Sequence, residues 1–348
     1  MPKDRSTARG QHHVPIMLQD AFASPGNGKK PQVHVFDKHE DRTFRTSPEN
    51  ILQERDFNTF ENGEVTYCLE DGMGKIEDQA APALRKVIAN RTLACLDDKE
   101  RAAILVFTAL QRIRGVHTRA GMLDIETQIR ERLRSNGDDP DLVPQLRGSN
   151  EPEQIKLSAL TLVGKNLPEF SRSYTNKVMV LMEACPGETF LLGDTPVVLA
   201  NQNDTFPYGN LGLEVKGIEI YLPISPDLTI AFWCPSIISL IETALRRCEE
   251  AIKNTNAVAL LGVGPDAQKL RELHPQLKVR AAKLREDLGG IKSQATLKNA
   301  PENMEYMNSL QVAYAERYVL SSTGDFALAK RMIGENGRYR RGHRWQLA

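Results

Sequence analysis

The 348-residue chain carries 45 basic and 45 acidic side chains, so it has no net charge at neutral pH. This balance excludes strong non-specific attraction of the whole protein to nucleic acid or to an anionic membrane, and any such contact must be local. Hydrophobic residues make up 41% of the chain and charged residues 26%, and no apolar run approaches the about 20 residues that span a bilayer.

The N-terminal residues and the cysteines predict the compartment. Residues 1–10 carry Lys3, Arg5 and Arg9 and no apolar segment follows them, so we expect no signal peptide and a reducing, cytoplasmic location. The five cysteines are widely spaced and form no Cys-x-x-Cys pair, which argues against a disulfide framework and against a structural zinc site. We expect them to be small core residues.

After a disordered lead over residues 1–10, the sequence predicts a β-hairpin. Residues 33–36 and 42–45 alternate between apolar and polar side chains and are joined by the charged residues 37–41, a pattern typical of two antiparallel strands.

From about Asp78 the apolar period changes from 2 to 3.6, which predicts helices. Asp97 followed three residues later by Glu100 predicts a capping box at the start of one helix, which ends near Gly115. This helix and the residues just after it present Gln111, Arg114 and Arg119. Another long helix is expected over residues 152–184, bent near Pro168.

Four apolar runs then predict successive strands of an antiparallel sheet: residues 190–192, 197–199, 218–222 and 228–233. Asp194 lies between the first two runs, beside Pro196, which has no N–H for a ladder. We expect the backbone to kink there and to turn the carboxylate toward an edge or a cleft. The alternative is that Asp194 closes its own turn through an Asx hydrogen bond.

Helices follow over residues 237–253 and 267–288, and the last helix begins at Pro301, a favoured first helical position. One flank of the last helix carries Asn308, Gln311 and Arg317. Residues 338–345 predict a basic tail with no apolar period. Together these elements predict an α+β fold: a central, mostly antiparallel sheet packed against long helices, with a helical insertion.

The glycines of residues 262–264 follow an apolar run and precede a helix, which is superficially similar to a dinucleotide-binding fingerprint. The rest of the βαβ unit is missing from the sequence, so a helix stop with Gly at its C-cap is the better interpretation.

Six short motifs occur in the chain in the same order as in the bacterial DUF4238 family, so the sequence resembles this family, whose function is unknown. They are His12 and Pro15 with Phe22; Phe36, Asp37 and Lys38; Gln111, Arg114 and Arg119; Asp194 and Pro196; Pro223, Ser225 and Pro226; and Asn308, Arg317, Ser321 and Ser322. His13 and Asn58 depart from the pattern, because the family has an aromatic residue and a tyrosine at these places.

The resemblance implies an α+β core formed by residues 11–238 and 301–322, interrupted by a helical insertion over residues 239–300 and followed by a basic tail over residues 323–348. Relatives are similar to proteins from bacterial mobile-element and phage-defence settings. This implies a context but no reaction.

The motif residues suggest a hydrolase, most plausibly a nuclease-like effector acting on phosphodiester or nucleotide substrates. His12 would be a general acid or base, Asp194 a base or metal ligand, and Asn308 would orient substrate or water. The predicted substrate-binding residues are Gln111, Arg114, Arg119 and Arg317, since guanidinium groups bind phosphate in a bidentate fork. The sequence contains no His-x-His, no paired Asp-x-Asp and no helical Glu-x-x-His, so a divalent metal is not favoured.

The alternative function is a non-enzymatic sensor that uses the same polar pocket to bind a ligand or a partner. Each residue also has a structural interpretation: a helical Asn or Gln can cap a neighbouring strand, and an Arg can satisfy carbonyl groups. The basic tail could follow a nucleic-acid backbone, with Tyr339 and Trp345 stacking on bases, or be a solvated end. If His12 and Asp194 meet in an open cleft, an enzyme is favoured; if either is buried with its partners satisfied, binding or structure is favoured.

Overall fold

The computed structural model describes residues 10–25, 30–62, 65–203, 211–261 and 265–344. It confirms the predicted α+β fold, with helices packed against several largely antiparallel sheets. The larger sheet has the strand order β12-β7-β11-β10-β9. Its strands are β7 (Val178–Glu183), β9 (Val198–Ala200), β10 (Glu219–Ser225), β11 (Leu228–Trp233) and β12 (Thr296–Lys298). All neighbours are antiparallel except β12 and β7.

A second sheet of four antiparallel strands has the order β3-β2-β13-β8. Its strands are β2 (Val33–Asp37), β3 (Arg42–Thr46), β8 (Leu192–Gly193) and β13 (Tyr318–Ser321). The predicted hairpin is confirmed as β2 and β3. The placement of residues 190–192 in the same sheet as the three later runs was wrong, because β8 pairs with β13 instead.

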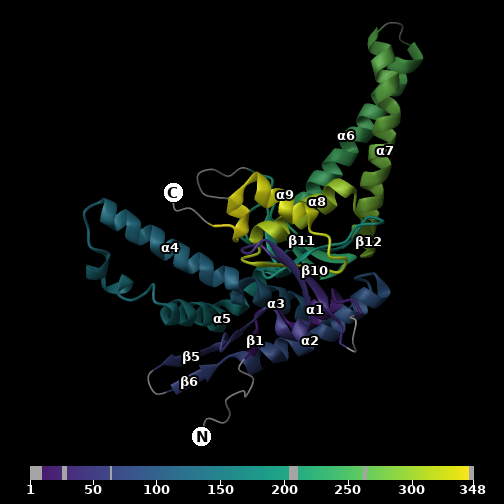
Figure 1. Cartoon of the computed structure of the whole chain (residues 1–348). Helices are drawn as coiled ribbons and strands as arrows, with labels where there is room; N and C mark the ends of the chain where they lie inside the picture. The colour runs from purple at the N-terminus through teal and green to yellow at the C-terminus, as the bar shows by residue number, and fades with distance from the viewer. Residues whose placement is uncertain (1–9, 26–29, 63–64, 204–210, 262–264, 345–348) are drawn as a thin grey trace.

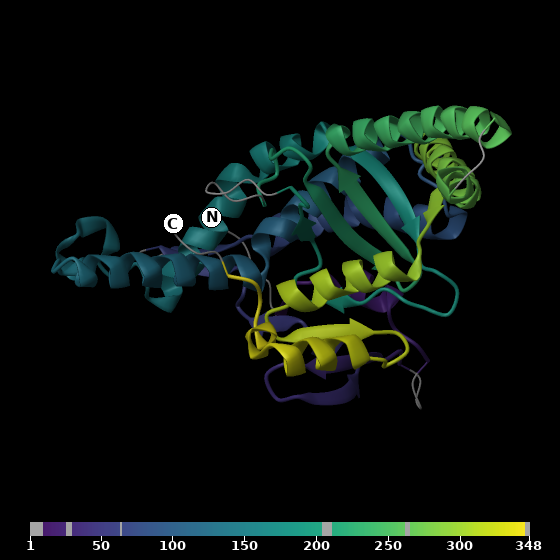
Figure 2. The same cartoon turned by 90° about the horizontal axis from the view of Figure 1, so that it is seen from above.

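Helix α8 (Pro301–Tyr314) joins the two sheets and begins at Pro301 as predicted. It contacts β9 and β8, which are the edge strands of the larger and smaller sheet, and Figure 2 shows it running between the two layers. Met304 and Met307 on this helix are buried in the main hydrophobic core. The position of α8 therefore decides how the segment 189–196 is held.

Helices α1 (Ile16–Ala21), α2 (Glu70–Asn90), α3 (Asp98–Arg114) and α5 (Pro152–Thr175) form the other side of the molecule, with α3 packed against both α2 and α5. The predicted capping box is present, since Asp97 accepts the N–H of Glu100 and Glu100 accepts the N–H of Asp97. The prediction of a helix over residues 152–184 was too long. Residues 178–183 form β7, because strand pairing with β11 outweighs local helical preference.

Two pairs of helices project from the body (Figure 1). Helix α4 (Val116–Ser135) accompanies α5, and α6 (Pro235–Leu261) packs against α7 (Pro265–Ser293). The latter pair confirms the two helices predicted in this part of the chain, while the glycine motif at 262–264 lies outside the described residues. In the described parts of the chain, no helix has the length and hydropathy needed to cross a membrane.

The C-terminal segment is folded onto the body. Residues 323–348 were predicted to be a basic tail, but α9 (Ala327–Glu335) lies within them. Its residues Met332 and Ile333, with the preceding Phe326, pack in a second hydrophobic cluster with Phe36 and Val319. A nine-residue helix contributes too few apolar positions for its period to be visible in the sequence. Trp345 lies outside the described residues.

Candidate functional site

The structure divides the predicted site residues into two groups. His12, Gln111, Arg114 and Arg119 come from the N-terminal segment, α3 and α4. Asp194, Asn308 and Arg317 lie where α8 meets the smaller sheet. The charged groups that act on His12 are Glu70 and Glu77, whereas the one that acts on Asp194 is Lys38, so these two residues have different electrostatic neighbours.

The side-chain carboxylate of Asp194 accepts hydrogen bonds from three backbone N–H groups. Its Oδ1 accepts the N–H of Glu316 at 2.7 Å, and its Oδ2 accepts those of Arg317 and Tyr318 at 2.7 and 2.8 Å. The residue is only 2% exposed, and burial raises the pKa of its carboxyl to about 6 although the three N–H groups and Lys38 oppose this. The expected opening toward a cleft was wrong, because the buried carboxylate faces the backbone of residues 316–318, which are distant in the sequence. It does not close its own turn either.

Two amides on α8 hold the adjacent segment. Asn308 accepts the N–H of Leu191 at 2.8 Å and donates to the carbonyl of Thr189 at 2.9 Å. One turn later, Gln311 accepts the N–H of Gly193 at 2.9 Å and donates to the carbonyl of Pro196 at 3.1 Å. Each amide therefore replaces the backbone partners of an edge strand, as the structural interpretation of a helical Asn or Gln requires.

Arg317 and its neighbours connect β13 to the N-terminal hairpin. The guanidinium of Arg317 binds Asp37 through Nη2 at 2.8 Å and through Nε at 3.1 Å. Next to it, the ammonium of the buried Lys38 donates to the carbonyls of Val312, at 2.6 Å, and Ala315. Burial lowers the pKa of Lys38 to about 8. The second group thus fastens strands that are far apart in the sequence.

The first group surrounds His13, which follows β1 (Gly10–His12). The His13 ring lies 5.4 Å from the ring of Phe57, and the Arg119 guanidinium lies 3.4 Å from the centre of the same Phe57 ring. Burial, together with the charges of Arg114, His12 and Arg119, lowers the pKa of His13 to about 3. His13 therefore experiences the charges of two arginines.

This region concentrates unsatisfied polar atoms. Among the described residues, fifteen buried side-chain nitrogen and oxygen atoms lack a hydrogen-bond partner, and eight of them are here. Because buried polar groups in proteins are nearly always hydrogen-bonded, such a concentration indicates a site for a ligand or for water. We call these residues the N-terminal polar cluster: His12, His13, Asn58, Gln111, Arg114 and Arg119.

Arg114 has the most informative geometry in the cluster. Its Nη1 pairs with Glu77 at 2.6 Å, whereas its Nε and Nη2 have no partner within the described residues. These two atoms form the side-on fork with which a guanidinium binds two oxygen atoms of one anion. Gln111 precedes Arg114 by one helical turn on α3, and both atoms of its amide are also buried and unpartnered.

Two carboxylates near the cluster, Glu70 and Glu77, already have partners. Glu77 binds Arg114, and Glu70 accepts a hydrogen bond from the amide of Asn58 at 2.6 Å. Burial lowers the pKa of His12, against the opposing effects of the Pro48 backbone and of Glu70. Sequence reasoning did not select Asn58, Glu70 or Glu77. The available signal was that Asn58 departs from the family pattern beside Phe57.

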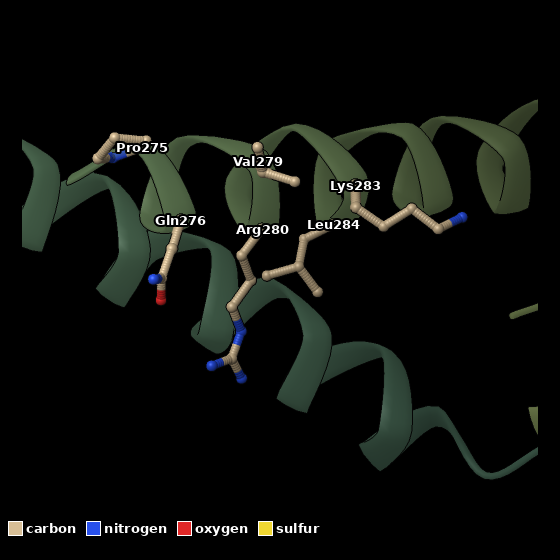
Figure 3. A pocket seen from close by; sticks show the side chains of 6 residues that line it. All are labelled: Pro275, Gln276, Val279, Arg280, Lys283 and Leu284. Atoms are coloured by element: carbon tan, nitrogen blue, oxygen red, sulfur yellow. The ribbon is translucent and has the colours of Figure 1, made fainter. Parts of the chain in front are cut away.

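Other features lie elsewhere. A surface groove along α7 is lined by residues of that helix, and Figure 3 shows Gln276, Arg280 and Leu284 pointing toward the neighbouring helix. Within the residues that can be described, no three His, Cys, Asp or Glu side chains gather as metal ligands.

A family model matches residues 10–325, which include both groups of predicted site residues, and its description is "Protein of unknown function (DUF4238)". The chain belongs to the DUF4238 family. No curated protein and no solved structure matches this DUF4238 chain.

A pH experiment tests the environment of His13 in this DUF4238 protein. The pKa of His13 is lower in the folded state than in the unfolded chain, so the unfolded chain binds the proton first as the pH falls below about 6.5. Neutral His13 therefore makes its full contribution to the unfolding free energy above a pH of about 6.5, and this contribution is lost as the pH falls toward 3. His13→Phe keeps an aromatic ring beside Phe57 but cannot bind a proton. When the pH is lowered from 7 to 5, we expect the unfolding free energy of this variant to fall by about 2 kcal/mol less than that of the wild type. Urea denaturation at both pH values measures this, and parallel losses in the two proteins would contradict it.

Proposed function

We propose that this DUF4238 chain is a ligand-binding module whose N-terminal polar cluster binds a phosphate group, carried by a nucleotide or a similar small molecule. The observation that supports this best is the unpartnered side-on fork of the buried Arg114. A bidentate contact between this fork and two oxygen atoms of one phosphate would satisfy both N–H groups at once.

The remaining members of the cluster suit the same ligand. Arg119 donates through Nη2 to the carbonyl of Phe57, but its Nε is unpartnered, and the described residues offer it no carboxylate within ion-pair distance. Burial lowers the pKa of Arg119 to about 10, which leaves it charged at neutral pH. The Gln111 amide adds a donor, and neutral His12 and His13 can each donate or accept. A doubly charged anion would compensate two buried cations of which only Arg114 has a carboxylate partner.

The hydrolase interpretation takes second place. Its catalytic pair was His12 and Asp194, and the acceptor sites of Asp194 are taken by three backbone N–H groups. His12 remains the candidate acid or base for such a reaction. Nuclease-like activity, a nucleic-acid partner and a phage-defence setting therefore stay predictions, which the same purified protein can test.

The test is calorimetric titration of the full chain with inorganic phosphate, AMP, ATP and a short RNA. We expect at least one of these to bind, and Arg119→Gln to weaken that binding by a factor of about 10 to 100, the effect of losing a hydrogen bond to a charged group. The matched control is Arg130→Gln, because Arg130 is also buried but pairs with Glu126 and Asp141, and it should bind as the wild type does.

Absence of binding to all four ligands, or equal affinities of the wild type and Arg119→Gln, would overturn the proposal. Incubation of the same preparations with labelled RNA, single-stranded DNA and duplex DNA, with and without Mg²⁺, tests the hydrolase. Cleavage that disappears in His12→Ala would move the hydrolase to first place.

A further inference from the structure

A second polar cluster surrounds Arg112, which belongs to none of the predicted site residues. Arg112 lies in the last turn of α3 and is 9% exposed. Its guanidinium lies 5.9 Å from the centre of the Tyr314 ring, and it has no hydrogen bond or ion pair to a carboxylate within the described parts of the chain. A largely buried charge without a counter-ion is costly, so an anion bound beside Arg112 would stabilise it.

Tyr174 lies within electrostatic range of Arg112 and has a free hydroxyl among the described residues. This residue of α5 is completely buried, interacts electrostatically with Arg112, and has no hydrogen-bond partner for its Oη within the described residues. Its ring is held edge-on by Phe232 of β11 at 5.3 Å, so the hydroxyl has a fixed position. The Tyr314 hydroxyl lies near the backbone of Leu199 without a hydrogen bond of normal geometry.

Further basic side chains surround Tyr314. The Tyr314 ring contacts the rings of His117 and His343, at 5.4 and 5.9 Å between centres. His343 also experiences the charges of Arg338, Arg344 and Arg112.

The carboxylate of Glu316 is already bound. His117 Nδ1 lies 2.8 Å from Glu316 Oε1, and both Nη atoms of Arg344 donate to Glu316 at 2.7 Å. The charge of Arg112 is therefore left uncompensated.

We infer that Arg112, Tyr174 and Tyr314 form a binding site for a small monovalent anion, either a halide or the carboxylate group of a small acid. One uncompensated guanidinium matches one negative charge, and hydroxyl groups donate well to both kinds of anion. The site lies between α3, α5 and α8. It does not depend on the proposed phosphate site, since Arg112 and Arg114 are two residues apart on α3 and so face different directions.

Crystals of the full chain grown in sodium bromide test the location. The inference predicts a bromine anomalous peak within contact distance of the Arg112 guanidinium. If the only peaks lie on the exposed surface or beside Arg114, the inference is overturned.

Thermal unfolding at constant ionic strength tests the site in solution. Replacing bulky isethionate by bromide or by acetate should raise the Tm of the wild type by about 3 °C for the anion that binds, and the response of each salt identifies the ligand as a halide or a carboxylate. Arg112→Met should abolish the response. Tyr174→Phe, which removes only the hydroxyl, should reduce it at least twofold even if Arg112→Met does not fold.

The control is Arg130→Met, which removes a buried but paired guanidinium; it should lower the Tm in every salt and keep the wild-type response. A wild type that responds to neither anion, or a full response in Tyr174→Phe and in folded Arg112→Met, would overturn the inference.

Discussion

Replacing Asp194 by alanine should lower the free energy of unfolding by at least about 4 kcal/mol. The substitution leaves the buried N–H groups of Glu316, Arg317 and Tyr318 without acceptors, and each unsatisfied group costs about 1–3 kcal/mol. It also removes the negative charge that partly compensates the buried ammonium of Lys38. Since domains are stable by only about 5–15 kcal/mol, this loss is a large fraction of the total stability.

Urea denaturation followed by circular dichroism measures this loss. The matched control is Asp227→Ala, because Asp227 binds Arg91 and the Ser225 hydroxyl at a half-exposed position. An exposed ion pair contributes little, so this control should lose at most about 1 kcal/mol. If both alanine variants lost the same amount, the three hydrogen bonds of Asp194 would not have the structural role assigned to them.

The same substitution, Gln to Met, should change the free energy of unfolding in opposite directions at two positions of the chain. This is the second large effect that we expect. Gln111 and Gln311 are both 1% exposed, but the amide of Gln111 has no partner among the described residues, whereas that of Gln311 binds the backbone of Gly193 and Pro196. Gln111→Met removes an unsatisfied polar group and should stabilise the ligand-free protein by about 1 kcal/mol. Gln311→Met leaves two backbone groups unsatisfied and should destabilise it by about 2–4 kcal/mol.

Urea denaturation of the three proteins in phosphate-free buffer gives both values. The stabilised Gln111→Met should also bind phosphate ligands more weakly than the wild type, which is the expected behaviour of a site that evolution keeps at a cost in stability. Destabilisation by Gln111→Met would show that its amide has a partner in the ligand-free protein, and would remove Gln111 from the proposed site.

Features with a local cause could be predicted from the sequence. The capping box at Asp97 and Glu100 depends on residues within one turn, and the β2–β3 hairpin depends on alternation around a short charged loop. Features fixed by distant partners could not. Residues 178–183 form a strand because β11 lies beside them, and β8 joins the smaller sheet because β13 and Gln311 reach it from the C-terminal part of the chain.

The same division applies to the candidate site. The motifs selected Gln111, Arg114 and Arg119, three of the residues whose unsatisfied atoms mark the N-terminal polar cluster. They also selected Asp194 and Asn308, whose partners lie more than 100 residues away. A sequence shows that a residue is polar and that it belongs to a motif. Whether its side-chain donors and acceptors bind backbone groups or stay without a partner is decided only when the helices and sheets pack together. Gln111 and Gln311 look alike in the sequence for this reason.

The position of β13 has a consequence for synthesis. This strand lies between β2 and β8, and the ion pair beside it joins Asp37 to Arg317, 280 residues apart. On the ribosome, β2 therefore leaves the exit tunnel long before the strand that completes it, and one of its edges stays open while the intervening residues are translated. The nascent chain cannot close its smaller sheet until β13 has been synthesised, so a premature stop before residue 318 would release a product with an exposed, aggregation-prone β-edge.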